Sequence, residues 1–450
     1  MKLSERVYYK MTMIKEFFNS MSELQKRLLF SLFVLVIFRV GSFVPLPGVN
    51  ASAVVRQMFG GAGGGMFGML DTFAGGSLSR MSVLALGIFP YISASIVIQL
   101  LSTASKSLGE LRKEGAAGRV KINQYTRYLA IGLCAVQGLA VARGLMAMAP
   151  VDGIPAVVNP GLFFQISTVV ALTGGTAFVM WLSEQITARG FGQGASLLIF
   201  AGIVAEIPSG LAKLASLASV GSASPFMILL ISAFVVGIVA LIAFVEQSQR
   251  RIQILYPRQA SMTGMANSQS SYLPIKINMS GVMGAVFASS IMMLPAFLMK
   301  FMNSESFAVQ QIMAFFTYGT WSYILLFSAL VVFFTFFQTA VVFNSEETAS
   351  QLKNAGGYIP GVRPGEQTQV FLDNIVSRTT AIGAAYLVFV CVLPIILNTR
   401  FGMPLVIGGT SVLIVTGVVL DTFNQIQSYI IAKQYSSVIK KANKKSRFRV

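Results

Sequence analysis

Apolar segments, each about as long as a membrane-spanning helix, alternate with shorter polar segments along nearly the whole chain. A helix rises about 1.5 Å per residue, so roughly 20 apolar residues cross a ~30 Å hydrocarbon core. The pattern predicts ten spans, near residues 28–46, 76–101, 128–148, 161–182, 195–217, 226–245, 277–299, 315–343, 380–398 and 405–431. The fifth is the weakest, because its apolar run ends at Glu206 and Lys213 follows.

One apolar segment is too short to span. The nine residues MFGMLDTFA lie between the glycine clusters GGAGGG and GGS, and as a helix they would measure about 14 Å. Irregular backbone at membrane depth is tolerated only beside protein or a water-filled cavity. The segment therefore predicts a cavity, and Asp71 at its centre supports this, since a carboxylate would not face lipid. A loop outside the membrane with an amphipathic turn remains the alternative.

The distribution of basic residues predicts the orientation. The chain is 54% hydrophobic and 11% charged, and it holds 34 Lys and Arg against 16 Asp and Glu. With ten spans and a cytoplasmic N-terminus, 27 basic residues fall inside, six fall outside, and Arg39 lies within the first span. Removing the fifth span would put 14 of those 27 on the wrong side. The positive-inside rule therefore favours ten spans with both termini cytoplasmic.

Little in the composition points to catalysis. There is no histidine, no nucleotide-binding glycine loop, and only Cys134 and Cys391, which we expect to be buried free thiols. We expect no cofactor and no metal. Ionisable residues within the spans are few, and the ones we identify are Arg39, Glu206, Asp421 and, at a span end, Glu184.

Two other kinds of membrane protein fit this pattern less well. A secondary transporter with a broken helix would place charge near the midplane, where it is sparse here. An intramembrane enzyme would need paired acids facing one cavity, and the sequence offers Asp421 no evident partner.

Two long polar loops, 246–276 and 344–379, and a basic tail, 432–450, are predicted on the cytoplasmic side. Loops of this size between spans usually carry function, although solvated connectors are the alternative. The second loop combines a helical start with glycine and proline turns. For the tail, attraction to anionic lipid is the simplest interpretation.

Seven motifs occur in order between Glu23 and Lys441: DTFAGGSLSR, ALGIFPYISASIVIQLL, EGAAGRVKINQYTRY, WLSEQITARGFGQGASLLIFAGIV, LPIKINMSGVMGAVFASSI, TAVVFNSEETASQLKNAGGYIPGVRPGEQT and GGTSVLIV. With these motifs the chain resembles the SecY family, the protein translocation channels of bacteria. The resemblance implies an all-α polytopic membrane protein, with ten transmembrane helices in two inverted five-helix halves around an hourglass pore with a re-entrant plug helix.

The resemblance also divides the chain into segments. They are a cytoplasmic N-terminal segment (1–27), a first five-helix half (28–217) with the plug at about 66–77, the sixth span (218–245), the cytoplasmic loop 246–276, spans seven and eight (277–343), the cytoplasmic loop 344–379, spans nine and ten (380–431) and the basic tail (432–450).

Family motifs assign roles to particular residues. The apolar ring at the waist of the pore would be Ile88, Ile92, Ala195, Ile199, Val286 and Ile414, and the plug would include Met66, Phe67, Leu70, Asp71 and Phe73. An apolar constriction of this kind gates by dewetting. Two ring positions depart from the family pattern, because Ala195 replaces a large aliphatic residue and Val286 is smaller than isoleucine.

A lateral gate between spans two and seven would carry Ser93, Ser95, Gln99, Ser289 and Ser290, whose contacts across the gate would be modest and breakable. Ordinary helix packing is the alternative for these polar residues. The cytoplasmic contacts would be Arg250, Arg251, Arg258 and Arg363, and the absence of charge from Gln259 to Leu273 would leave fewer phosphate partners for ribosomal RNA.

The implied function is a passive channel subunit, not an enzyme, in the bacterial inner membrane. It would pass unfolded secretory polypeptides outward and release hydrophobic segments sideways into lipid. Its implied partners are SecE, SecG, the SecA ATPase, the translating ribosome, polypeptides bearing signal sequences, and membrane lipids.

Overall fold

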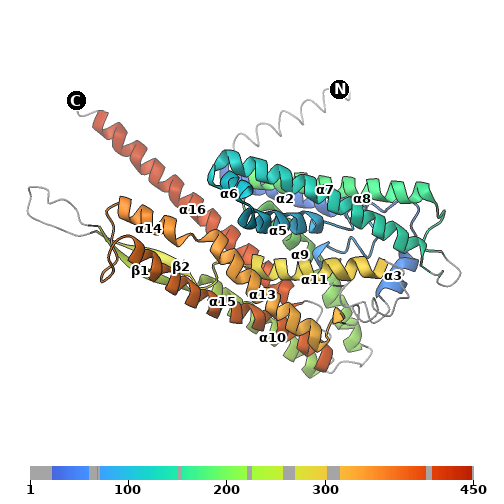
Figure 1. The fold of residues 1–450 in the computed structure, drawn as a ribbon. Coiled ribbons are helices and arrows are strands. Elements are labelled where there is room, and N and C mark those ends of the chain that lie inside the picture. Colours follow the sequence, from blue (N-terminus) through green and yellow to red (C-terminus); the bar gives the residue numbers. More distant parts are fainter. Residues whose placement is uncertain are drawn as a thin grey trace, which may run out of the picture.

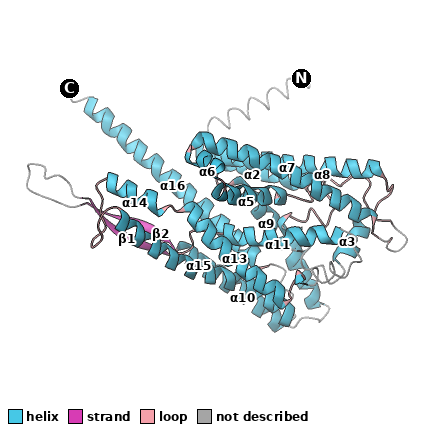
Figure 2. Ribbon diagram, viewed as in Figure 1, coloured by secondary structure: helices cyan, strands magenta, loops and turns pink. Residues whose placement is uncertain are grey.

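The computed structural model describes residues 23–59, 68, 71–148, 150, 155–219, 225–256, 269–301, 315–401 and 408–447. This part of the chain is almost entirely helical, with one small two-stranded sheet (Figure 1, Figure 2). Ten helices lie at the ten predicted spans: α2 (Glu23–Gly41), α5 (Phe89–Ala104), α7 (Ala116–Met146), α8 (Leu162–Arg189), α9 (Gly194–Ser219), α10 (Pro225–Gln247), α11 (Met283–Phe301), α13 (Trp321–Val342), α15 (Glu366–Phe401) and α16 (Gly409–Arg447).

Seven helices among the described residues are long and apolar enough to cross a membrane. The helices α5 and α11 are apolar but have shorter apolar stretches, and α2 carries charges at both ends. The outer surfaces of the bundle are apolar, and Phe163 and Phe244 are 86% and 75% exposed. Large apolar surfaces are stable only against lipid or protein. The prediction of a mostly helical, polytopic membrane protein is confirmed.

The helices form two groups. Helices α2, α5, α7, α8 and α9 pack together, and α10, α11, α13, α15 and α16 form a second set. Contacts between α5 and α11, and between α9 and α16, join the two sets. The main core lies where the sets meet, and it buries residues from both, including Ile92, Ile199 and Ile414.

The second span begins later than predicted. The apolar run suggests a helix from residue 76, but residues 74–88 fold as successive turns and α5 starts at Phe89. Gly75, Gly76 and Gly87 all have positive φ angles, which interrupt a right-handed helix, and Pro90 then occupies the first turn of α5. We call residues 74–88 the return segment.

The two predicted cytoplasmic loops fold as one unit. Loop 246–276 contains an antiparallel hairpin of β1 (Gln249–Tyr256) and β2 (Gln269–Lys276), and loop 344–379 contains α14 (Ser345–Asn354) and the first turns of α15. Leu255 and Tyr358 exchange backbone hydrogen bonds of 2.9 and 3.0 Å, which attach the second loop to β1. The two shorter helices are α3 (Ala51–Phe59) and α6 (Lys106–Lys113).

The start of α14 is stabilised by a capping residue, Asn344, that is recognisable in the sequence. Asn344 Oδ1 accepts hydrogen bonds from the backbone N–H groups of Glu346 (3.1 Å) and Glu347 (3.3 Å), which caps α14 as the helical start of this loop predicts. The tail continues as the end of α16, which projects from the bundle as far as Arg447 (Figure 1).

Candidate channel, plug and gate

A cavity of about 320 Å³ lies where the two groups of helices meet. One part of its wall is polar and includes Gln99, Gln193, Glu246 and Asn278. Another part is apolar and carries ring positions. The cavity is therefore a chamber with one polar and one apolar wall, and it lies between helices that come from both halves of the chain.

Five of the six predicted ring residues line this one cavity: Ile92, Ala195, Ile199, Val286 and Ile414. The sixth, Ile88, does not line it but is buried in the same core. Four different helices (α5, α9, α11 and α16) contribute the five residues. Apolar side chains brought together from four helices can close around an extended polypeptide without recognising its sequence. The residues assigned by motif are thus neighbours in space.

Phe73, at the end of the predicted plug, and Leu84 and Ile88 of the return segment pack into the same core. Phe73 is buried, belongs to that core, and its ring lies 5.8 Å from the ring of Phe89 between centroids. The predicted plug residues Met66, Phe67 and Leu70 lie outside the described residues.

Asp71, the carboxylate of the predicted plug, is buried. Its Oδ1 accepts a 2.8 Å hydrogen bond from the backbone N–H of Ser79, within the return segment. Burial raises the pKa of the Asp71 carboxyl above its ordinary value, and the hydrogen bonds from Ser79 oppose this shift. The carboxylate does not face lipid, as predicted.

Comparison with known proteins decides the family. The family model described as SecY matches residues 82–423. A protein translocase subunit SecY from Rickettsia bellii is 44% identical over 428 residues, covering 95% of this chain and 98% of the relative. Another, from Escherichia coli strain K12, is 43% identical over 429 residues, with coverage of 95% and 96%.

The chain belongs to the SecY family. It is a protein-conducting translocation channel, not a catalytic enzyme, and a multi-pass protein of the bacterial cytoplasmic membrane. Solved structures agree on the fold. A protein-conducting channel superposes with a TM-score of 0.63 at 17% identity, covering 90% of this chain and 92% of that one. Sec61 in the canine ribosome–channel complex from the endoplasmic reticulum gives 0.60 at 15% identity, covering 90% and 92%.

Two of the serines predicted at the lateral gate of this SecY-family chain donate hydrogen bonds within their own helix. Helices α5 and α11 are in contact, and Ser93, Ser289 and Ser290 are buried. However, the hydroxyls of Ser289 and Ser290 both donate to the carbonyl oxygen of Val286, at 2.9 and 2.8 Å. Both hydroxyl donors are therefore used within α11, because a helical serine easily reaches a preceding carbonyl, and the gate role of these serines stays a prediction.

The other two predicted gate residues face the central cavity. Ser95 accepts a 3.3 Å hydrogen bond from Gln99 Nε2, one turn away on α5. The Gln99 Oε1 and Gln338 Oε1 atoms are buried in the cavity wall without a hydrogen-bond partner. These acceptors remain available to a polar group that enters the cavity.

The predicted cytoplasmic contact residues are exposed. Arg250 and Arg251 lie on β1, and Arg363 lies in the turn before α15. All three lie on the unit that the two cytoplasmic loops form together. Arg258 lies outside the described residues. Exposed guanidinium groups on a folded platform suit contacts with phosphates or carboxylates.

A polar cluster beside the return segment was not predicted. Arg39 Nη1 donates a 2.5 Å hydrogen bond to the carbonyl oxygen of Gly75, and Arg80 Nη2 lies 3.4 Å from Glu206 Oε1. Both guanidinium groups also lie over the ring of Phe43, at 5.1 and 4.4 Å from its centroid. The cluster fastens the return segment to α2 and α9.

Close backbone packing accompanies this cluster. A Cβ on Gly75 would lie 2.9 Å from the Cα of Gly202 on α9, and Gly75 has a φ of +68°. Only glycine fits this approach without displacing the return segment. In the sequence, Arg39 and Glu206 point to such a cluster, because charged residues inside a membrane need partners. The partner of Glu206, Arg80, is 126 residues away in the chain, so spacing alone did not reveal it.

Asp421 pairs with a basic residue rather than with a second acid. Its Oδ1 lies 4.0 Å from Lys276 Nζ, and both residues line the central cavity with Glu246. Glu246 in turn accepts a 2.6 Å hydrogen bond from Asn278 Nδ2. These charges make one side of the chamber hydrophilic. Cys134 and Cys391 are buried free thiols, as predicted. The described residues hold no group of three or more metal-binding side chains.

Proposed function

We propose that this SecY-family channel passes unfolded secretory polypeptides through the ring of Ile88, Ile92, Ala195, Ile199, Val286 and Ile414. The observation that carries the proposal is the convergence of five of these residues on one cavity that is polar elsewhere. A hydrated polypeptide can enter the polar chamber, and the apolar collar excludes water and ions around it. Hydrophobic segments leave sideways between α5 and α11.

In the resting channel, the plug closes the side of the ring opposite the chamber. Burial of Phe73 against the ring core and the Arg39, Arg80 and Glu206 contacts support this role. Both termini and the two loops lie on the cytoplasmic side, where the exposed arginines of β1 and of the turn before α15 meet SecA or the ribosome. SecE and SecG complete the complex, and SecA or translation supplies the energy.

A reconstituted transport assay tests this function. The chain is co-purified with SecE and SecG, placed in vesicles, and supplied with SecA, ATP and a secretory precursor. We expect protease-protected precursor only when the chain, SecA and ATP are all present. Arg363→Glu is expected to reduce protection at least tenfold, whereas the matched change Arg378→Glu on α15 is expected to have little effect. Equal protection in vesicles that lack the chain would contradict the proposal.

A further inference from the structure

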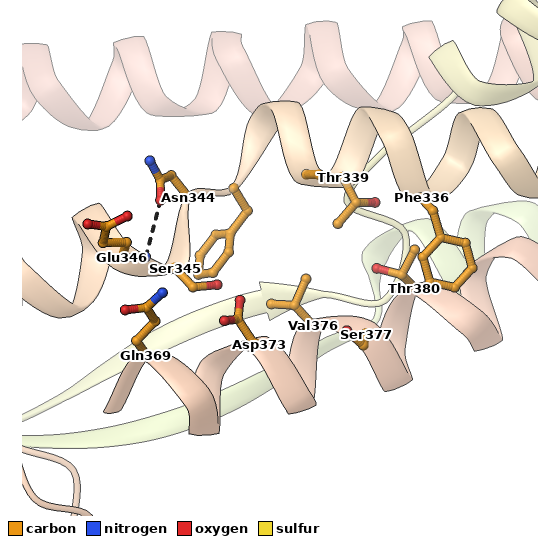
Figure 3. A pocket seen from close by; sticks show the side chains of 12 residues that line it. Phe336, Thr339, Asn344, Ser345, Glu346, Gln369, Asp373, Val376, Ser377 and Thr380 are labelled. Carbon is orange, nitrogen blue, oxygen red and sulfur yellow. Dashed lines mark hydrogen bonds between the residues drawn. The ribbon is translucent and has the colours of Figure 1, made fainter. Parts of the chain in front are cut away.

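A second pocket, separate from the central cavity, lies at the cytoplasmic ends of the spans in the second group of helices. It has a volume of about 430 Å³ and is enclosed by the end of α13, the start of α14 and one face of α15 (Figure 3). Its volume falls in the range of ~300–1,000 Å³ that is usual for small-molecule sites. It shares no lining residue with the central cavity.

The polar side chains on the face of α15 that lines this pocket change along the helix from a carboxylate to hydroxyl groups. Asp373, Ser377 and Thr380 follow one another at helical spacing, from the start of α15 toward the membrane-spanning part. Asp373 is exposed, whereas Thr380 is only 2% exposed. A carboxylate thus lies at the exposed mouth, and the buried Thr380 hydroxyl lies deeper.

The deepest of these polar groups lacks a partner. Thr380 Oγ1 is buried and forms no hydrogen bond with the protein, and Figure 3 shows it directed toward the pocket. A buried hydroxyl without a partner is unfavourable, so most are satisfied by protein, water or ligand. The nearby Thr339 hydroxyl differs, because it donates a 2.8 Å hydrogen bond to the carbonyl oxygen of Thr335. An oxygen-bearing ligand would satisfy Thr380.

The opposite wall is apolar and continues into the membrane. Phe336 lines the pocket and is 42% exposed, and Phe333, on the preceding turn of α13, is 54% exposed. Because α13 is a membrane span, these rings face hydrocarbon chains. The pocket therefore presents a polar mouth and an apolar track, which fits an amphiphile better than a single side chain from a protein partner.

The charge of the lining selects the headgroup. Glu346 and Asp373 both line the pocket, and its lining contains no lysine or arginine. Two carboxylates favour a cation, and a primary ammonium offers three hydrogen-bond donors. A headgroup whose only charge is negative would be repelled.

We propose that this pocket binds a phospholipid with a primary ammonium headgroup. The ammonium lies between Glu346 and Asp373, the hydroxyls of Ser377 and Thr380 donate to phosphate or glycerol oxygens, and an acyl chain lies along Phe336. The assignment to the cytoplasmic leaflet rests on the topology proposed above, but the lipid site itself does not.

Native mass spectrometry of the full-length chain tests this site. Phosphatidylethanolamine, phosphatidylcholine and phosphatidylglycerol are added separately at equal concentration. We expect phosphatidylethanolamine to bind at least tenfold more tightly than the other two. The double change Glu346→Gln with Asp373→Asn should abolish this preference, and Thr380→Val should weaken binding several-fold.

Glu347→Gln is the matched control, because Glu347 is the next residue on α14 and does not line the pocket. It should leave the preference unchanged. Equal binding of the three lipids to the unchanged chain, or an undiminished preference in the double variant, would overturn the proposal.

A second measurement does not depend on detergent-purified variants. Ser377→Cys, in a chain with Cys134→Ser and Cys391→Ser, is labelled with a maleimide in vesicles. Labelling should be several-fold slower in vesicles of phosphatidylethanolamine than in vesicles of phosphatidylcholine. Protection that is equal in both lipids and requires a partner subunit would assign the pocket to a protein and overturn the lipid site.

Discussion

Replacing Glu206 with glutamine tests whether the polar cluster beside the return segment holds the channel closed. At 3.4 Å, two unit charges attract by about 5 kcal/mol at an effective dielectric constant of ~20. The side chains of Arg80 and Glu206 are 32% and 24% exposed, so screening and desolvation offset much of this attraction. Exposed pairs contribute ~0.2–1 kcal/mol, and breaking a buried pair costs ~3–5 kcal/mol. We therefore expect Glu206→Gln to destabilise the closed channel relative to the open channel by about 1–2 kcal/mol.

That loss should appear as an ion leak. Because a tenfold change in an equilibrium corresponds to about 1.4 kcal/mol, the open fraction of the resting channel should rise about 5- to 30-fold. Chloride flux from vesicles that contain the reconstituted complex, without SecA or precursor, measures this directly. The reversed pair, Arg80→Glu with Glu206→Arg, should restore much of the seal.

Glu184→Gln is the matched control. Glu184 also pairs with an arginine near the end of a span, at 2.6 Å from Arg127, but it lies away from the return segment. It should leave the resting flux unchanged. If Glu206→Gln leaks no more than Glu184→Gln, the ion pair does not hold the plug and the reasoning fails.

Three further predictions concern the gate, the plug and the ring. Arg112 Nη2, on α6, donates a 2.6 Å hydrogen bond to the carbonyl oxygen of Val341 on α13 and so joins the two groups of helices. Arg112→Ala should make it easier for the two groups to separate. In the vesicle assay, transport of a precursor with a weakened signal sequence should therefore rise about two- to fivefold. The raised pKa of Asp71 means that the closed plug holds this proton more tightly than a solvated plug does, so closure is favoured at low pH and this contribution is lost as pH rises through the raised pKa. Resting chloride flux should therefore increase as pH rises, and Asp71→Asn should remove that dependence. Ala195→Ile should narrow the ring and lower resting flux several-fold in a Glu206→Gln background, and an unchanged flux would show that Ala195 does not line the constriction.

The sequence predicted the ten spans because the need to bury apolar surface in lipid acts on each segment separately. It misplaced the start of the second span because the return segment is also apolar, yet Gly75, Gly76 and Gly87 turn it before α5 begins. Hydropathy measures burial and does not distinguish a helix from a buried turn.

The ring residues could be assigned only by resemblance, since apolar residues at helical spacing usually belong to an ordinary core. The partners of Glu206 and Asp421 could not be assigned at all, because each pairs with a residue that is distant in the chain. The packing of the two cytoplasmic loops into one unit could not be predicted either, because the backbone hydrogen bonds between Leu255 and Tyr358 depend on the packed hairpin.

The most direct test of the account is a disulfide crosslink at Ile199. The chain carries Cys134→Ser, Cys391→Ser and Ile199→Cys, and a precursor with one cysteine is arrested partway through reconstituted membranes and then oxidised. We expect an adduct at position 199 and none at Phe389→Cys, an exposed position on α15. Absence of the adduct, with the precursor still protected in the vesicles, would mean that the polypeptide takes another route.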